Sequence, residues 1–146
     1  MTETQLLCWR IGQQYFGIPL SDCKEVREHA RVYDIPESRS YVLGVANLRG
    51  EVVTVIDLKK VAGMQDSQSA RPELSSCTLV RIKDNEQELA IMVDSLADIM
   101  TVEENQMEEP PANFNERQLA TSRAVVQTEK GMLIVLAVSE IKKVAD

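Results

Sequence analysis

Residues able to carry catalysis or to bind metals are few in this chain. It has one histidine, His29, and three cysteines that lie far apart in the sequence, Cys8, Cys23 and Cys77. An odd number of cysteines cannot pair completely within one chain, and no Cys/His cluster with zinc-ligand spacing is present. The sequence therefore predicts reduced thiols in or near apolar surfaces, and a protein that folds without a metal or cofactor.

Long hydrophobic runs and an excess of positive charge are also lacking. The longest uncharged apolar run, Gly131 to Ser139, is far too short to span a bilayer. The first residues, Met1 to Gln5, lack the basic-then-apolar pattern of a secretion signal. The 16 basic and 23 acidic residues give a net charge of -7, which argues against nucleic acid or an anionic membrane as a partner. We expect a cytoplasmic protein that does not insert into membranes.

Recognisable catalytic arrangements are missing as well. His29 follows Glu28 in a charged stretch, so an exposed structural histidine is favoured over a general base. Asp57 and Asp94 each end an apolar segment, and capping or turn roles explain them better than a carboxylate pair. No serine or cysteine stands in a nucleophile-elbow context, and the kinase motifs are absent. The sequence predicts a binding protein and not an enzyme.

Short strands account for most of the hydrophobic pattern. Alternation at residues 6–11 and 15–20 flanks a Gly12-Gln13-Gln14 turn, and residues 79–82 and 89–93 flank a turn at 84–86. Near the C-terminus, residues 124–128 and 132–138 flank Glu129-Lys130-Gly131 in the same way. Polar stretches at 65–76 and 103–115 are typical of surface loops. Many short strands with frequent turns predict a mostly β barrel or sandwich.

Four short helical segments are expected among these strands. Asp57 stands at an N-cap position before residues 58–62, with Gly63 as the stop. Asp22 and Glu25 have the spacing of a capping box, with Cys23, Val26 and Ala30 at helical intervals. Residues 38–43 form one or two further turns in this prediction, and Ser139 caps a final helix over 140–144.

The segment from Gly44 to Val61 is the most informative part of the sequence. Two β-branched stretches flank a tight turn that contains Arg49 and Gly50, which predicts a hairpin followed by the short helix at 58–62. This segment resembles the signature of the CheW-like domain family, the adaptor module of bacterial chemosensory arrays. The matching residues are Asn47, Leu48, Arg49, Gly50, Asp57 and Leu58.

The resemblance extends from about Leu6 to Val144 and implies a fold. It implies a single CheW-like domain over residues 1–146, made of two intertwined SH3-like β-barrel subdomains of five strands each. An internal similarity fits this architecture, because residues 55–61 and 137–144 both run from an apolar strand into a segment that ends in Lys-Lys-Val.

The resemblance also implies a receptor-binding surface. Arg49 matches the family's receptor-contacting arginine, although it can equally hold the turn through its own hydrogen bonds. Glu25 is open to the same two interpretations, as a contact or as a capping residue. The receptor-side residues are completed by Cys23, Gly44, Thr78 and Leu79, whereas Asn47, Gly50 and Asp57 belong to the structural motif.

The partners follow from the resemblance too. They are the regulatory domain of a CheA-type histidine kinase and the cytoplasmic hairpin tip of a chemoreceptor, a methyl-accepting chemotaxis protein. Departures from the family pattern at Cys23, Arg39, Thr54 and Ala90 leave the pathway open, so an adaptor of type IV pilus motility or of another chemosensory-like system is an alternative. A small-molecule sensor that uses the groove between the barrels is a further alternative, with less support.

Overall fold

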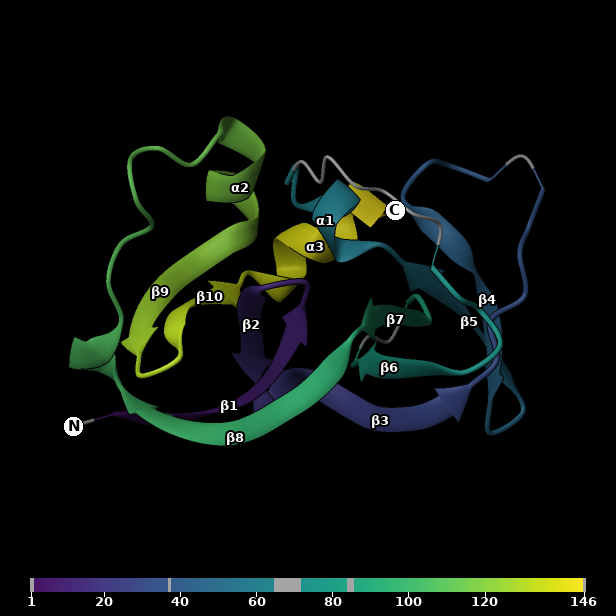
Figure 1. Ribbon diagram of the computed structural model, residues 1–146, viewed down its shortest axis with the longest axis horizontal. Coiled ribbons are helices and arrows are strands. Elements are labelled where there is room, and N and C mark those ends of the chain that lie inside the picture. Colours follow the sequence, from purple (N-terminus) through teal and green to yellow (C-terminus); the bar gives the residue numbers. More distant parts are fainter. Residues whose placement is uncertain (1, 37, 65–71, 84–85, 146) are drawn as a thin grey trace.

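The computed structural model describes residues 2–36, 38–64, 72–83 and 86–145. Ten strands in this part of the chain form two five-stranded sheets (Figure 1). Sheet A has the order β8 (Ser95–Glu103), β1 (Glu3–Ile11), β2 (Gln14–Pro19), β10 (Gly131–Leu136) and β9 (Ser122–Thr128). Sheet B has the order β3 (Cys23–Ala30), β6 (Cys77–Ile82), β7 (Leu89–Val93), β5 (Glu51–Ile56) and β4 (Val42–Leu48). The mostly β fold with two five-stranded units is confirmed; that residues 1–146 form one independent domain stays a prediction.

The two sheets repeat one pattern of strand pairing. In sheet A the antiparallel hairpin β1–β2 joins the hairpin β9–β10 through the parallel pair β2 and β10, and β8 adds to the outer side of β1. In sheet B the hairpin β6–β7 joins β4–β5 through the parallel pair β7 and β5, and β3 adds to β6. The chain builds part of sheet A, then sheet B, and then returns to sheet A. The two units are therefore intertwined.

In the described ranges three short helices lie beside the sheets: α1 (Leu58–Val61), α2 (Glu116–Thr121) and α3 (Val138–Ala145). The predicted cap of α1 is confirmed, because the Asp57 carboxylate accepts a hydrogen bond from the Lys59 amide at 3.1 Å. Both β5 and β10 lead directly into a helix, as the internal similarity indicated. In both helices the matched lysine pair lies in the last turn, Lys59 and Lys60 in α1 and Lys142 and Lys143 in α3.

The helix predicted after Asp22 is wrong, because this segment is strand β3. Its ladder with β6 is irregular between Cys23 and Glu25 and again between Arg27 and Ala30. These irregularities break the two-residue alternation of a strand and leave the apolar residues at intervals that imitate a helix. The short segment Leu20–Asp22 before the strand is a 3-10 turn.

Other differences are smaller. Residues 38–43 hold a turn and the start of β4 in place of the predicted helix, and α3 starts before Ser139 and not after it. Strand β8 and helix α2 were not predicted; β8 is largely exposed, so its apolar residues do not alternate clearly. The predicted loop at 103–115 includes a 3-10 turn at Glu104–Gln106. Most of the predicted loop at 65–76 and the turn at 84–86 fall outside the described residues.

The described residues form a hydrophobic core of three parts. The largest lies between the two sheets and includes Trp9 and Phe16 from sheet A, Ile56 and Ile91 from sheet B, and Ile141 from α3. In Figure 1 the helices α1 and α3 lie over the junction of the two sheets. A second cluster, with Leu79 and Ala90 among its members, is drawn mainly from sheet B, and a third, with Leu6 and Cys8, from sheet A. Each sheet thus has its own core on the face away from the shared one.

Gly44 is required by a close backbone contact in this core. Its φ is +155°, and a Cβ atom at this position would lie 2.2 Å from the carbonyl oxygen of Tyr33. Tyr33 forms an isolated bridge with Val45, so the two segments cannot separate without losing hydrogen bonds.

We expect Gly44→Ala to lower the free energy of unfolding by about 1–3 kcal/mol, because it forces an overpacked contact between two backbones. Urea unfolding followed by circular dichroism measures this change. Gly50→Ala is the control, since Gly50 has a φ of +82° but no atom within 4 Å of the added Cβ. Equal losses in both variants would mean that φ, and not the contact with Tyr33, makes glycine necessary.

Candidate protein-binding site

The turn between β4 and β5 presents Arg49 to solvent. Arg49 and Gly50 have φ values of +54° and +82°, the left-handed pattern of a type I′ hairpin turn. The Asn47 side-chain oxygen accepts a hydrogen bond from the Gly50 amide at 3.0 Å, which holds the turn closed. A left-handed arginine costs roughly 1 kcal/mol. Asn47 and Gly50 therefore stabilise the turn. The side chain of Arg49, which lies in this turn, is 75% exposed.

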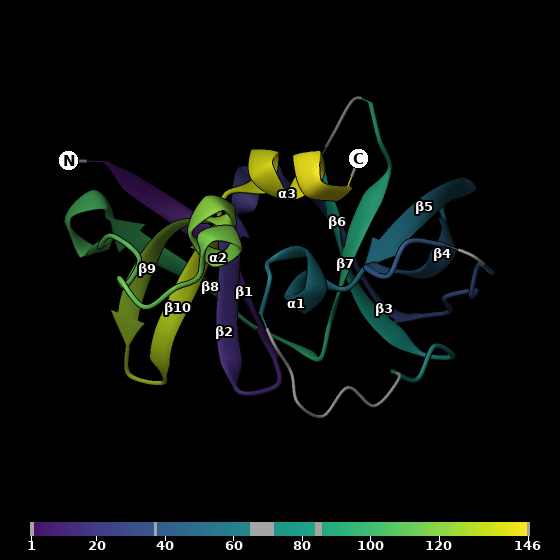
Figure 2. The ribbon, with the colours of Figure 1, turned by 90° about the horizontal axis from the view of Figure 1, so that it is seen from above.

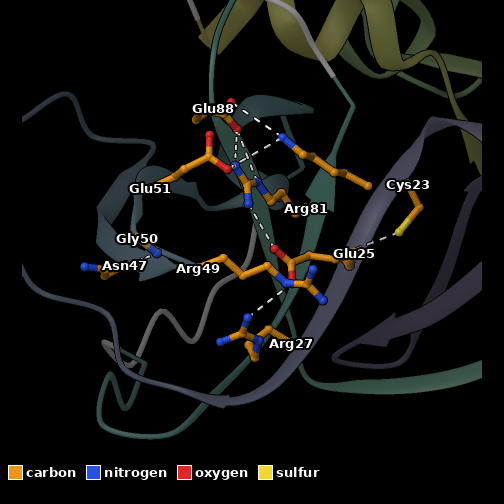
Figure 3. A network of polar contacts seen from close by, with 10 residues as sticks. Cys23, Glu25, Arg27, Asn47, Arg49, Gly50, Glu51, Arg81 and Glu88 are labelled. Atoms are coloured by element: carbon orange, nitrogen blue, oxygen red, sulfur yellow. Dashed lines mark hydrogen bonds and ion pairs between the residues drawn. The ribbon is translucent and has the colours of Figure 1, made fainter.

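Glu25 of β3 binds three arginines (Figure 3). One carboxylate oxygen accepts from Nη1 of Arg81 at 2.9 Å, and the other lies 3.3 Å from Nη2 of Arg27 and 3.4 Å from Nε of Arg49. Only 13% of the Glu25 side chain is exposed. Glu25 thus joins the exposed hairpin turn to a buried cation.

Arg81 of β6 is that cation, and its side chain is 1% exposed. Its guanidinium donates to Glu25 on β3, to Glu51 at the start of β5 and to Glu88 just before β7. Lys24 lies 3.9 Å from Glu51 and 3.7 Å from Glu88. Figure 3 shows the guanidinium between Glu51 and Glu88 on one side and Glu25 on the other. Arg81 therefore ties together elements from three separate parts of the chain.

The charges in this network stabilise one another. Burial by itself raises the pKa of Glu25, but hydrogen bonds from Arg81 and Arg27 outweigh burial, so its pKa is lowered. A hydrogen bond from Arg81 also lowers the pKa of Glu88. Burial lowers the pKa of Arg81, yet its bonds to Glu88, Glu25 and Glu51 leave it raised above the usual arginine value. Glu25, Glu88 and Arg81 are therefore ionised at neutral pH.

Sequence reasoning did not find Arg81. The available signal was one arginine inside the apolar run from Leu79 to Ile82, at a position that alternation assigns to the core. A buried arginine needs carboxylates, but nothing in the sequence indicated which ones.

The other predicted receptor-side residues are dispersed. Cys23 is half-buried at the start of β3, its thiol donates to the Glu25 carbonyl at 3.5 Å, and burial raises its pKa. Gly44 and Leu79 are buried, so a receptor cannot touch their side-chain positions directly. Thr78 is half-buried on β6. The structure brings Arg49, Glu25, Asn47 and Gly50 together, with Cys23 beside them. Asp57 lies at the other end of β5.

Both aspartates considered for catalysis have structural partners. Asp57 caps α1, and the Asp94 carboxylate accepts from the Gly12 amide at 2.6 Å. The exposed His29 has its Nδ1 3.2 Å from the Ser76 hydroxyl. Asp57 and Asp94 line a cleft of about 620 Å³ between the sheets, together with Lys59, Lys60, Leu43 and Met92. Within the described ranges, no three His, Cys, Asp or Glu side chains are grouped so that they would hold a metal ion.

A family model described as the CheW-like domain matches residues 5–145. The chain belongs to the CheW-like domain family. A chemotaxis protein CheW of Thermotoga maritima is 26% identical to it over 141 residues, covering 97% of this chain and 89% of the relative. A probable chemotaxis protein CheW of Rhizobium etli is 28% identical over 134 residues, covering 92% and 84% of the two chains. The crystal structure of the scaffolding protein TtCheW from Thermoanaerobacter tengcongensis has a TM-score of 0.74 at 23% identity, covering 92% and 89%.

Membership in the CheW-like family makes this chain a non-enzymatic adaptor of chemosensory signalling. This agrees with the absence of catalytic motifs from the sequence. In the described part of the chain, no helix is both long and apolar enough to cross a membrane.

Proposed function

We propose that this CheW-like chain couples the cytoplasmic hairpin tip of a chemoreceptor to the regulatory domain of a CheA-type histidine kinase. The observation that carries the proposal is the Arg49–Glu25 ion pair, in which Glu25 is also held by an ion pair with the buried Arg81. An adaptor has no chemistry to perform, so it transmits ligand state by holding two partners in a defined geometry. A surface that is already rigid loses little entropy on binding.

Arg49 is suited to recognise a receptor side chain. Among the described residues its only ion pair is through Nε to Glu25, and three quarters of its side chain is exposed to solvent. A planar guanidinium binds a carboxylate or a backbone carbonyl with defined direction. We propose that the receptor tip contacts Arg49 and the exposed edge of Glu25, next to Cys23, and that Gly44, Thr78 and Leu79 support this surface through the packing of β4 and β6.

The kinase must bind elsewhere, because a protein that uses one patch for both partners would make them compete. Sheet A supplies surface away from the Arg49 turn, which lies in sheet B. The proposal therefore places the chain at the cytoplasmic ends of membrane receptors through its partners and without insertion of its own.

Calorimetric titration with each purified partner tests the proposal. The wild-type chain should bind a receptor hairpin fragment and a kinase regulatory domain, each with a one-to-one stoichiometry. A chain that binds neither partner would contradict the proposed function.

A further inference from the structure

Within the ranges that the structure describes, each five-stranded sheet has two edge strands, and three of these four edges are occupied or irregular. Strand β4 pairs on its outer side with Tyr33 at Val45, and β9 pairs on its outer side with Glu108 at Val125. Strand β3 is irregular, because its ladder shifts register twice and His29 has a left-handed φ of +58°. An irregular strand is a poor template for another strand. The fourth edge strand is β8.

Strand β8 is regular and exposed in its second half. It pairs with β1 without a register shift from Ile99 to Glu103, and no described backbone group pairs with its other side. The Ile99 side chain is 54% exposed, and Thr101 is exposed as well. Figure 1 shows β8 at the lower border of the molecule, and Figure 2, viewed from above, shows it running behind β9 and β10. This edge of sheet A is therefore open to solvent.

A hydrogen bond at the end of the ladder shows which backbone groups of β8 face outward. The Glu104 amide donates to the Thr2 carbonyl at 3.1 Å, so the backbone groups of Glu104 face the β1 side. In an antiparallel ladder, successive residues direct their N–H and C=O groups alternately toward the partner strand and away from it. The N–H groups of Glu103, Thr101 and Ile99 therefore point to the outer side of β8.

Side chains occupy two of these three outward N–H groups. The Ile99 amide donates to Oδ1 of Asp98 at 3.1 Å, and the Glu103 amide donates to Oε1 of Gln106 at 2.7 Å. Gln106 reaches back to the strand from the 3-10 turn that follows β8. The N–H of Thr101, which lies between the two, has no partner among the described residues. A strand that approached this edge would therefore find one free donor.

Without these caps, a second copy of the chain would match the edge of β8. A two-fold antiparallel pairing centred on Thr101 would join the three outward N–H groups to the outward carbonyls of the other copy. The exposed Ile99 would add an apolar contact to this pair. The same pairing would place Asp98 opposite Glu104 of the other copy, and like charges directly opposite each other destabilise a ladder. Asp98 thus opposes self-pairing through its hydrogen bond and through its charge.

We propose that the Asp98 and Gln106 side chains seal the outer edge of β8 and so keep the chain from pairing with a second copy of itself through this strand. An exposed strand with free N–H groups is a template for pairing between molecules, and proteins protect such edges with charged side chains and local irregularities. Asp98 and Gln106 are both exposed and belong to none of the three core clusters. Sealing the edge is therefore separate from holding the sheet together.

Sedimentation velocity over a range of protein concentrations tests this inference on the full chain. The double variant Asp98→Ala/Gln106→Ala frees two N–H groups in each copy. We expect its dimerisation constant to rise about ten- to a hundredfold above that of the wild type. Asp98→Asn alone keeps an acceptor oxygen and removes only the charge, so it should associate less than the double variant.

Two further variants show whether this association uses the β8 edge. Thr101→Pro, added to the double variant, removes the remaining outward N–H without breaking a hydrogen bond to β1. Thr101→Lys, added in the same way, places two positive charges opposite each other at the centre of the pair. Each substitution should return the double variant to wild-type sedimentation.

A double variant that sediments like the wild type at every concentration would overturn the inference. Association that neither Thr101 substitution reduces would overturn it too, because the contact would then lie elsewhere. Circular dichroism accompanies each measurement, and a double variant that has lost its fold would show that the two side chains support the sheet, which also contradicts the inference. These outcomes do not depend on receptor or kinase binding, so the proposed function is tested separately.

Discussion

Arg81→Met is expected to lower the free energy of unfolding by about 3–5 kcal/mol, the loss typical of removing one partner from a buried ion pair. The guanidinium is 1% exposed and binds carboxylates from β3, from β5 and from the residue before β7. Without the Arg81 guanidinium, Glu25 remains mostly buried, and its remaining partners, Arg27 and Arg49, are longer and more exposed contacts. Urea unfolding at neutral pH measures the change.

Arg27→Met is the matched control. The Arg27 side chain is 37% exposed and binds the same Glu25, so its loss should cost less than about 1 kcal/mol. A similar small loss for Arg81→Met would show that the network is a surface feature and does not hold the three elements together.

Lowering the pH should reduce the difference in free energy of unfolding between the wild-type protein and Arg81→Met. In the wild-type fold the pKa values of Glu25 and Glu88 lie below 4.5, so their ionised forms stabilise the fold above that pH. This contribution is lost as the pH falls through the lowered values. The variant keeps only the weaker contributions of Arg27 and Arg49 to Glu25 and of Lys24 to Glu88, so the two unfolding free energies should converge as the pH falls through the lowered pKa values. The usual pKa of a carboxyl group is roughly 4, so the titration should extend to about pH 3. A difference in unfolding free energy that stays constant over this range would contradict this account.

Arg49→Glu is expected to weaken receptor binding by about 2–5 kcal/mol, the range for disrupting a desolvated charge contact in an interface. The fold should change little, because the Arg49 side chain is 75% exposed. The new carboxylate would lie beside Glu25 and repel it, and it would also repel an acidic receptor group. Calorimetry gives the affinity, and circular dichroism confirms the fold.

Arg123→Glu is the control for charge reversal, since Arg123 is an exposed arginine on β9 of sheet A. It should leave receptor affinity within about twofold. Normal receptor binding by Arg49→Glu, or a variant that is simply unfolded, would remove Arg49 from the receptor surface.

The strands and turns were largely predictable because each depends on nearby residues. Leu89 to Val93 was predicted with its observed bounds, and Asp57 was predicted as a cap from its local spacing alone. Strand β3 was not predicted, because its irregular ladder with β6 depends on a strand that lies far along the chain. Arg49 and Glu25 were found through the family resemblance.

The ion pairs that the residues of the candidate site form with one another could not be predicted from the sequence. Arg81 is joined to carboxylates 56, 30 and 7 residues away, so no local pattern identifies them.

The most direct test of the adaptor is a sequential titration. The wild-type chain is first saturated with a receptor hairpin fragment, and the kinase regulatory domain is then added in the calorimeter. The two-surface account predicts that kinase affinity stays the same or increases, with a ternary complex of one copy of each protein by sedimentation. Kinase affinity that falls in proportion to the receptor concentration would show that the partners compete for one surface and would contradict the account.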